Sequence, residues 1–209
     1  MFYDPRHDEH GLPHNPWTAL VTPRPIGWIS SRSRDGVANL APYSFFHAVA
    51  GRPPFVMFSS TPRKNSLANI EETGAFAVNV ATWDLREEMN MSSAPFEHGV
   101  DEFELTGLEK AECRNVDVPR VAASPIAIEC ELYQCLPLRP KSGLPCETTM
   151  VIGEVVGIHI SDDILTEGRV DTARMRPLAR LGYMDYSSTE AVFEMLRPDP
   201  EDVRHADHR

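Results

Sequence analysis

Runs of β-branched and aromatic residues, broken by turn residues, predict strands along most of the chain. Apolar residues alternate clearly at 75–82. A long strand pair is predicted at 125–138 and 149–160, on either side of a polar turn. A tight turn at Asp35-Gly36 joins two earlier runs. The earlier predicted strands are 18–31, 37–46 and 53–60.

Two short segments favour helices. Residues 61–74 offer Asn65 or Ser66 as an N-cap and Gly74 for a left-handed C-terminal position. Residues 84–93 predict a second helix, capped by Asp84. The 18 prolines of the chain disfavour long uninterrupted helices. Together these patterns predict a mainly β fold, a small antiparallel barrel with a few short peripheral helices.

The chain of 209 residues is long enough for one domain with its own core. Residues 1–16 mix charge, Pro and Gly without a period and predict an irregular N-terminal arm. The domain itself is predicted to span residues 17–190. Because the end of the chain is charged and has no apolar face, residues 191–209 are predicted to form a disordered tail.

The net charge of −11 argues against nucleic acid or an anionic membrane as a partner, because both require a positive surface. Residues 1–70 hold seven basic and four acidic residues, whereas the remainder holds 13 and 27. A small anionic ligand is therefore expected to bind the first third of the chain. No apolar run reaches the roughly 18 residues of a membrane span. The acidic start differs from the basic flank of a signal peptide, which predicts a cytoplasmic protein.

The four cysteines are Cys113, Cys130, Cys135 and Cys146. None lies in a Cys-x-x-Cys pair or beside a histidine, so the sequence predicts no structural zinc site and no other metal site. In a cytosolic compartment the four thiols are expected to be reduced and mostly buried.

Residues 59–66 carry the strongest local chemistry. In this stretch, Ser-Ser-Thr-Pro-Arg-Lys-Asn-Ser, a predicted strand end passes through hydroxyls and two cations into a helix start. Free N–H groups, the positive end of the helix dipole and the basic side chains suit a phosphate group. A solvated turn with ordinary helix caps is the alternative interpretation.

Two further segments suit a planar ring. At 39–46, Pro42 interrupts the strand ladder and leaves backbone groups free beside aromatic residues, as the edge of a planar heterocycle requires. Alternatively, Phe45 and Phe46 are core residues and Asn39 caps a turn. Residues 24–30 add a cation, a glycine that allows close approach, and a hydroxyl.

Five segments in order carry a resemblance to a known family. They are RPIGWIS, NLAPYSFF, SSTPRKNSLANIEETGAFAVN, VIGEVVGIHI and LARLGYMDY. This ordered set resembles the flavin reductase-like proteins, which bind FMN in a split β-barrel. The likeness extends from about Trp17 to Tyr186, which is most of the chain.

The resemblance implies a set of FMN-binding residues. Those expected along the isoalloxazine ring and ribityl chain are Arg24, Pro25, Ile26, Trp28, Ser30, Asn39, Ala41, Pro42 and Ser44. Those expected at the phosphate are Ser59, Ser60, Arg63, Lys64, Asn65 and Ser66. Because family members are homodimers with the flavin near the subunit interface, Arg180 or Tyr186 is expected to reach a site on the partner chain.

The resemblance also implies an oxidoreductase that accepts hydride from NAD(P)H and passes electrons to free flavin, oxygen or a partner monooxygenase. One departure matters, because Thr148 stands where short flavin reductases carry a histidine near the nicotinamide site. His98 and His159 are substitute candidates, although a loop residue and an ordinary strand histidine are the simpler interpretations. Two alternatives stay open: a non-catalytic FMN-binding electron carrier or flavin sensor, and a barrel without a ligand.

Overall fold

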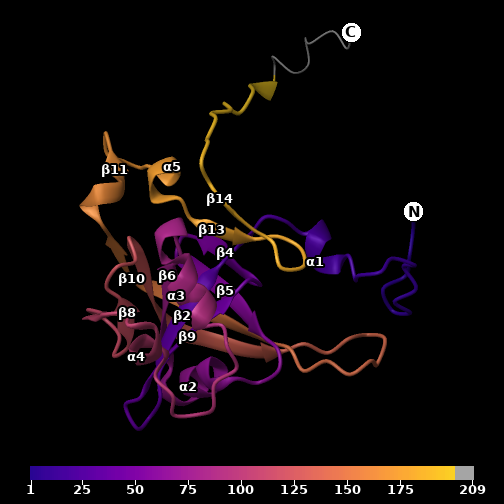
Figure 1. The fold of residues 1–209 in the computed structure, drawn as a ribbon, viewed down its shortest axis with the longest axis horizontal. Coiled ribbons are helices and arrows are strands. Elements are labelled where there is room, and N and C mark those ends of the chain that lie inside the picture. Colours follow the sequence, from indigo (N-terminus) through magenta and orange to yellow (C-terminus); the bar gives the residue numbers. More distant parts are fainter. Residues whose placement is uncertain (201–209) are drawn as a thin grey trace.

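Seven antiparallel strands form one continuous sheet that curls around the main core (Figure 1). The structure is a computed structural model that describes residues 1–200. β3 contacts β5 although no ladder joins them, so the sheet nearly closes into a barrel. The strands in spatial order are β3 (Ala38–Tyr43), β2 (Gly27–Arg32), β6 (Ala75–Val80), β9 (Ile126–Pro137), β10 (Thr149–Ile160), β5 (Pro54–Ser60) and β4 (Phe46–Gly51).

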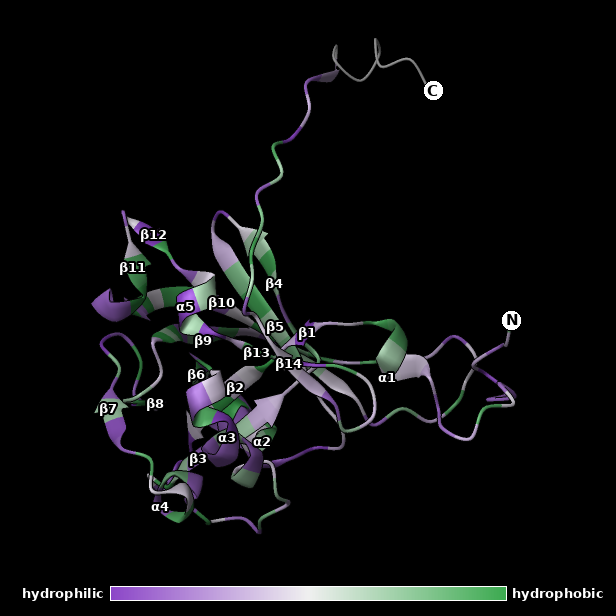
Figure 2. Cartoon of the chain, turned by 45° about the horizontal axis from the view of Figure 1, so that its top comes forward, coloured by the Kyte–Doolittle hydropathy of each residue, from purple (hydrophilic) through white to green (hydrophobic). Residues whose placement is uncertain are grey.

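Two apolar clusters lie on opposite sides of β2. Ile29 joins Phe58 and Phe76 inside the curled sheet, where α2 (Asn65–Thr73) closes one end with its buried leucine and isoleucine. Trp28 points the other way, into a second cluster with residues of α3 (Arg86–Met91) and α4 (Glu102–Thr106). Figure 2 shows the apolar residues gathered along the central strands. Because both faces of β2 are covered, its first five residues are all buried, and these include the polar Ser30 and Ser31.

The small peripheral elements bring distant segments of the chain together. The most important contact joins residues 24–25 to residues near 180, through β1 and β13. The short strands are β1 (Arg24–Pro25), β13 (Leu178–Arg180) and β14 (Tyr186–Ser188) in one sheet, with the pairs β7 (Lys110–Glu112) and β8 (Pro119–Val121), and β11 (Leu165–Thr166) and β12 (Arg169–Val170). The remaining short helices are α1 (Trp17–Leu20), η1 (Trp83–Leu85), η2 (Asp162–Ile164) and α5 (Thr172–Met175).

Both predicted helix starts were wrong in detail. The N-cap of α2 is Lys64, whose side chain makes no capping hydrogen bond. The predicted cap Ser66 lies within the helix, and its hydroxyl accepts a hydrogen bond from Asn39 instead. Asp84 lies inside η1 and does not cap α3. Gly74 does take the left-handed conformation after α2, with φ of 75°, as predicted.

The two ends of the chain extend from the barrel (Figure 1). Residues 1–16 contain no helix or strand, and neither do residues 189–199. The predicted disordered tail falls partly on residues 201–209, which lie outside the described residues. All four cysteines are free, but only Cys130 is buried and Cys146 is exposed, so the expectation of mostly buried thiols was wrong.

Replacing Gly153 by alanine is expected to destabilise the fold by roughly 1–3 kcal/mol, the usual cost of overpacking a core. An added Cβ would lie 2.4 Å from the ring of Phe76, which is itself wholly buried. The matched control is Gly51→Ala, because a Cβ there meets nothing within 4 Å. Urea denaturation of both variants measures the free energies of unfolding. Equal stability of the two variants would contradict the close packing described here.

Candidate functional site

Three clefts follow one another along a groove at the edge of the barrel. The Lys64 cleft, of about 330 Å³, and the Arg180 cleft, of about 320 Å³, share Pro42 and Ser93 in their walls. The Phe45 cleft, of about 490 Å³, shares Ser44 with the Arg180 cleft. Together they give room for a ligand larger than any one of them holds.

The Lys64 cleft lies where β5 turns into α2. Lys64 and Asn65 stand at the N-terminus of this helix, opposite Asn39 and Pro42 of β3. An ammonium group and free helix N–H groups at one place favour an anionic ligand. The position of this cleft agrees with the excess of basic over acidic residues in residues 1–70.

Glu102 of α4 faces the same cleft. Its Oε2 accepts a hydrogen bond of 2.9 Å from the backbone N–H of Leu40. Burial raises the pKa of this carboxyl above its usual value. A carboxyl group with a raised pKa is more easily neutral, so it opposes an anion in this cleft less than an ordinary glutamate would.

Eleven of the sixteen predicted cofactor residues line the groove. Those in the Lys64 cleft come mainly from β3 and the start of α2, and those in the other two clefts from β1, the β3–β4 turn, β5 and β13. The lining residues are Arg24, Pro25, Ile26, Asn39, Ala41, Pro42, Ser44, Ser59, Lys64, Asn65 and Arg180.

Four predicted residues lie behind the groove with buried side chains. The indole N–H of Trp28 donates to the Ser92 hydroxyl at 2.9 Å, and Ser92 itself lines the Lys64 cleft. Ser60 donates to the carbonyl of Pro62, another lining residue. Ser66 holds Asn39, and Ser30 accepts a bond from Asn79. These four side chains do not line the three clefts and instead hold their walls in place, and their contact with a ligand stays a prediction.

Arg63 does not line the groove either. Its guanidinium forms an ion pair of 2.7 Å with Glu71 on the exposed side of α2. Of the two adjacent cations, only Lys64 belongs to the wall of the cleft.

Arg24 is a buried residue that ties three segments together. Its guanidinium donates to the carbonyls of Thr18, Val21 and Leu181. Burial, followed by the nearby charge of Arg180, lowers the pKa of Arg24. Its Nε is buried without a hydrogen-bond partner among the described residues. Because Arg24 also lines the Phe45 cleft, it fixes the shape of that cleft and keeps one donor unused.

Arg180 lies in the wall of its own cleft. It donates to the Tyr186 hydroxyl and to the Tyr183 carbonyl, and its guanidinium stacks 4.4 Å from the centre of the Tyr186 ring. Both side chains line this cleft together with Ile26 and Pro42 of the same chain. Their reach toward a partner chain stays a prediction.

The three residues considered for the missing histidine occupy different places. The Thr148 hydroxyl lies 2.7 Å from the Thr61 hydroxyl, beside the start of the Lys64 cleft. His98 borders a crevice of only about 10 Å³. His159 lies at the opposite end of β10 from Thr148, roughly 30 Å or more along the strand at about 3.3 Å per residue. His159 is therefore no substitute at the groove.

Sequence reasoning missed the loop after α3. Residues 92–96 form one wall of the Lys64 cleft, and Met89, Asn90 and Met184 complete the Arg180 cleft. This loop carries no periodic pattern, and its position depends on how α3 packs against the second apolar cluster. The buried Trp28 is the available signal, since an enclosed indole N–H requires a partner.

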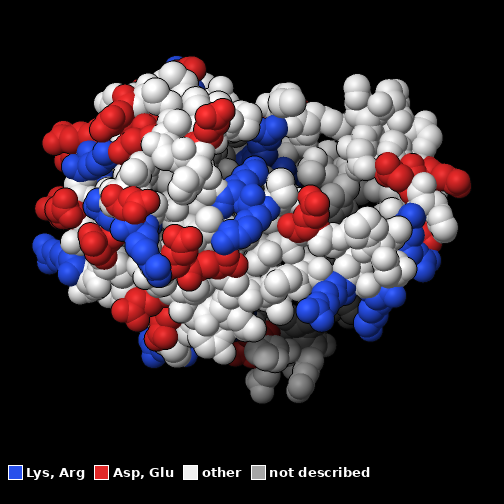
Figure 3. All heavy atoms as spheres, turned by 90° about the horizontal axis from the view of Figure 1, so that it is seen from below, with Lys and Arg blue, Asp and Glu red and all other residues white. Residues whose placement is uncertain are grey.

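Charge is unevenly spread over the surface. Figure 3 shows basic side chains grouped among acidic ones on one face of the molecule. Within residues 1–200, none of the helices combines the length and apolar character needed to cross a bilayer.

Comparison with known proteins gives one consistent result. A family model described as a flavin reductase like domain matches residues 20–186. An uncharacterised protein of Halalkalibacterium halodurans is 34% identical over 184 residues, which cover 85% of this chain and 87% of that protein. An uncharacterised protein of Aquifex aeolicus is 36% identical and covers 78% and 83%.

Two solved structures are similar to this chain over almost their whole length. The crystal structure of nitrilotriacetate monooxygenase component B from Bacillus cereus superimposes with a TM-score of 0.85 and 28% identity, covering 93% of this chain and 98% of that one. A putative flavin reductase with a split barrel domain from Shewanella frigidimarina has a TM-score of 0.81 at 23% identity, covering 95% and 100%. The predicted split β-barrel with few short helices is confirmed.

Proposed function

Because the chain belongs to the flavin reductase-like family, we propose that it is an FMN-binding oxidoreductase that uses NADH or NADPH. The observation that supports this proposal is the groove, in which a cleft with a lysine at a helix N-terminus is continuous with a largely apolar cleft. When bound, FMN supplies the redox chemistry, taking hydride from the nicotinamide and passing electrons to free flavin, oxygen or a partner monooxygenase.

The residues of the groove suit each part of FMN. The ammonium of Lys64, the Asn65 amide and the N-terminus of α2 provide donors for a phosphate. In the proposed assignment, Asn39 and Pro42 of the Lys64 cleft border the ribityl chain, and Ile26 and Ser44 of the Arg180 cleft border the ring. Such residues bind and orient a flavin, and this chemistry requires no acid–base pair from the protein.

The Phe45 cleft is the proposed place of the nicotinamide. Arg24, Pro25 and Ser59 line this cleft, so in this assignment they border the nicotinamide and not the parts of FMN that the resemblance implies for them. Leu20, Phe45 and Met57 give it a largely apolar lining next to the Arg180 cleft. An apolar surface of this kind excludes water and lets two flat rings lie against each other. The sequence has no Gly-x-Gly-x-x-Gly unit between a strand and a helix, so the nicotinamide is expected to bind on the flavin surface.

Two features support the proposed partners. The exposed apolar side chain of Val49 on β4, which follows the groove residues 44–47 in the chain, suits a homodimer interface near the groove. The similarity to a protein named as component B of a monooxygenase supports a separate oxygenase as electron acceptor. Four free cysteines fit the cytoplasm as the proposed compartment.

Anaerobic mixing of the FMN-loaded protein with NADH, and separately with NADPH, tests the reductase activity. We expect the flavin absorbance to bleach much faster than that of free FMN at the same concentrations, because the groove would hold both rings in contact. Bleaching at the rate of free FMN with both nucleotides would exclude the reductase.

The second candidate function is an FMN-binding electron carrier without a nicotinamide site. The observation that favours it is Thr148, which engages Thr61 and carries no imidazole at the position where short flavin reductases have a histidine. In that case the protein binds FMN but fails the bleaching experiment. A protein that binds no FMN at all would exclude both functions.

A further inference from the structure

A separate cleft, of about 490 Å³, lies at the far end of β10 from the groove. Its wall includes Glu129 of β9 and His159 of β10, and Gly157, two residues before His159, is the cross-strand partner of Glu129. The two side chains are bonded, His159 Nε2 to Glu129 Oε1, at 2.5 Å. Neither residue has a role in the proposed FMN site.

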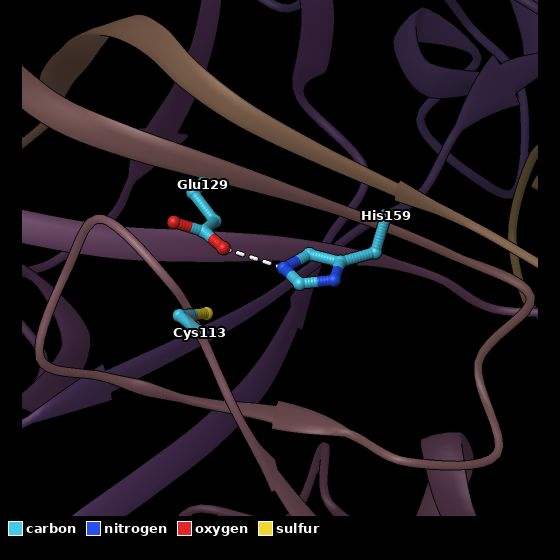
Figure 4. A group of neighbouring side chains, drawn as sticks. All are labelled: Cys113, Glu129 and His159. Atoms are coloured by element: carbon cyan, nitrogen blue, oxygen red, sulfur yellow. Dashed lines mark hydrogen bonds and ion pairs between the residues drawn. The ribbon is translucent and has the colours of Figure 1, made fainter.

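Cys113, which follows β7, completes this group. The thiol, carboxylate and imidazole ligand atoms all lie within 4.8 Å of one another. Figure 4 shows the three side chains converging from three different segments. Glu129 is wholly buried, and the other two are partly buried.

We propose that Cys113, Glu129 and His159 form a binding site for a zinc-type divalent metal ion. Thiolate, imidazole and carboxylate are the side chains that bind Zn²⁺, and three protein ligands leave the fourth tetrahedral position for water. The adjoining cleft supplies that water and an entry path. This site is independent of the proposed FMN-binding function.

The surroundings of Glu129 resemble those of a metal ligand. Its two oxygens accept hydrogen bonds from the backbone N–H groups of Arg114 at 2.8 Å and Asn115 at 2.7 Å. Such bonds fix the orientation of a ligating carboxylate. At Gly157, a Cβ would lie 2.9 Å from the carboxyl carbon, so the absence of a side chain makes room for this carboxylate.

The three ligand atoms must shift to reach tetrahedral separations. The Cys113 sulfur, which lies within 4.8 Å of the other two ligand atoms, must come to roughly 3.6 Å from each of them. Two ligands about 2.1 Å from a tetrahedral Zn²⁺ lie roughly 3.4 Å apart, so the Glu129–His159 contact must open by roughly 0.9 Å. The neutral imidazole carries its proton on Nδ1 when Nε2 binds the metal. The Cys113 thiol, whose pKa burial and then Glu129 raise to about 12, releases its proton to solvent on binding.

Titration of the chelator-treated, flavin-free protein with Co²⁺ tests the site. We expect one Co²⁺ per chain to produce a thiolate-to-cobalt charge-transfer band, and Zn²⁺ to displace it. Zn²⁺ should also raise the melting temperature, because it binds only the folded state.

Cys113→Ser and His159→Gln should each abolish the band and the rise in melting temperature. The matched controls are Cys135→Ser and Cys146→Ser, which should keep both because these thiols lie outside the group. Circular dichroism and FMN titration report whether each variant is folded. A band that survives in folded Cys113→Ser, or no band in the unmodified protein, overturns the proposal.

Discussion

Replacing Lys64 by alanine is expected to weaken FMN binding by about 10- to 100-fold, because a charge-assisted hydrogen bond contributes roughly 1.5–3 kcal/mol. Lys64 is the cation in the wall of the cleft at the start of α2. The fold should persist, since this side chain is exposed. Quenching of flavin fluorescence during titration gives the dissociation constant.

Arg63→Ala is the matched control for this prediction. Arg63 precedes Lys64 and has the same charge, but it pairs with Glu71 outside the cleft. We expect only a small loss of FMN affinity from Arg63→Ala. If Arg63 leaves Glu71 to help hold the phosphate, removing both cations should lower the affinity by about 100-fold or more. Unchanged affinity in Lys64→Ala would place the phosphate elsewhere.

Glu129→Gln is expected to destabilise the metal-free protein by about 1–3 kcal/mol at neutral pH, the usual cost of leaving a buried hydrogen-bonding group without its partner. The carboxylate is wholly buried and accepts bonds from two backbone N–H groups and His159. An amide turns one of these acceptors into a donor. Glu131→Gln is the control on the same strand, because Glu131 is exposed and should change stability by less than about 0.5 kcal/mol.

The free energy of unfolding lost in Glu129→Gln should depend on pH. Burial by itself raises the pKa of Glu129, but the hydrogen bonds from Arg114, His159 and Asn115 outweigh it and lower the pKa below its ordinary value. A lowered pKa in the folded state gives stability that is complete above the unfolded pKa of about 4.3 and is lost as the pH falls toward the folded value. Urea denaturation at several pH values should therefore show the difference between Glu129→Gln and the unmodified protein shrinking in acid. A difference that stays constant would contradict this role.

The barrel was predictable because its strands carry local signals. The long pair β9 and β10, the alternation of β6 and the left-handed Gly74 all follow from short-range pattern and backbone preference. Helix caps were less predictable, since the Ser66 hydroxyl is used by Asn39, a residue of another strand. When a side chain has two possible hydrogen-bond partners, the fold determines which of them it bonds, and its neighbours in sequence do not.

The residues of the groove also divide into those that the sequence predicts and those that it does not. Its lining residues from 24–26, 39–44 and 59–65 lie in recognisable segments, whereas the loop 92–96 has no motif. Trp28 and Ser30 match the family pattern, yet their side chains are buried behind the wall. Sequence similarity identifies which segments form a site, but burial determines which side chains face the ligand.

The order of apolar, glycine and proline positions was enough to predict a mainly β barrel, since backbone preference and burial act over a few residues. The family was indicated separately, by the resemblance of five ordered segments of the sequence. Which of two adjacent cations enters the cleft was decided by tertiary contacts, as was the meeting of Cys113, Glu129 and His159. These three residues come from separate segments and show no metal-binding spacing. Only the pairing of β9 with β10, and the packing of the loop after β7 on them, brings their ligand atoms within reach of one ion.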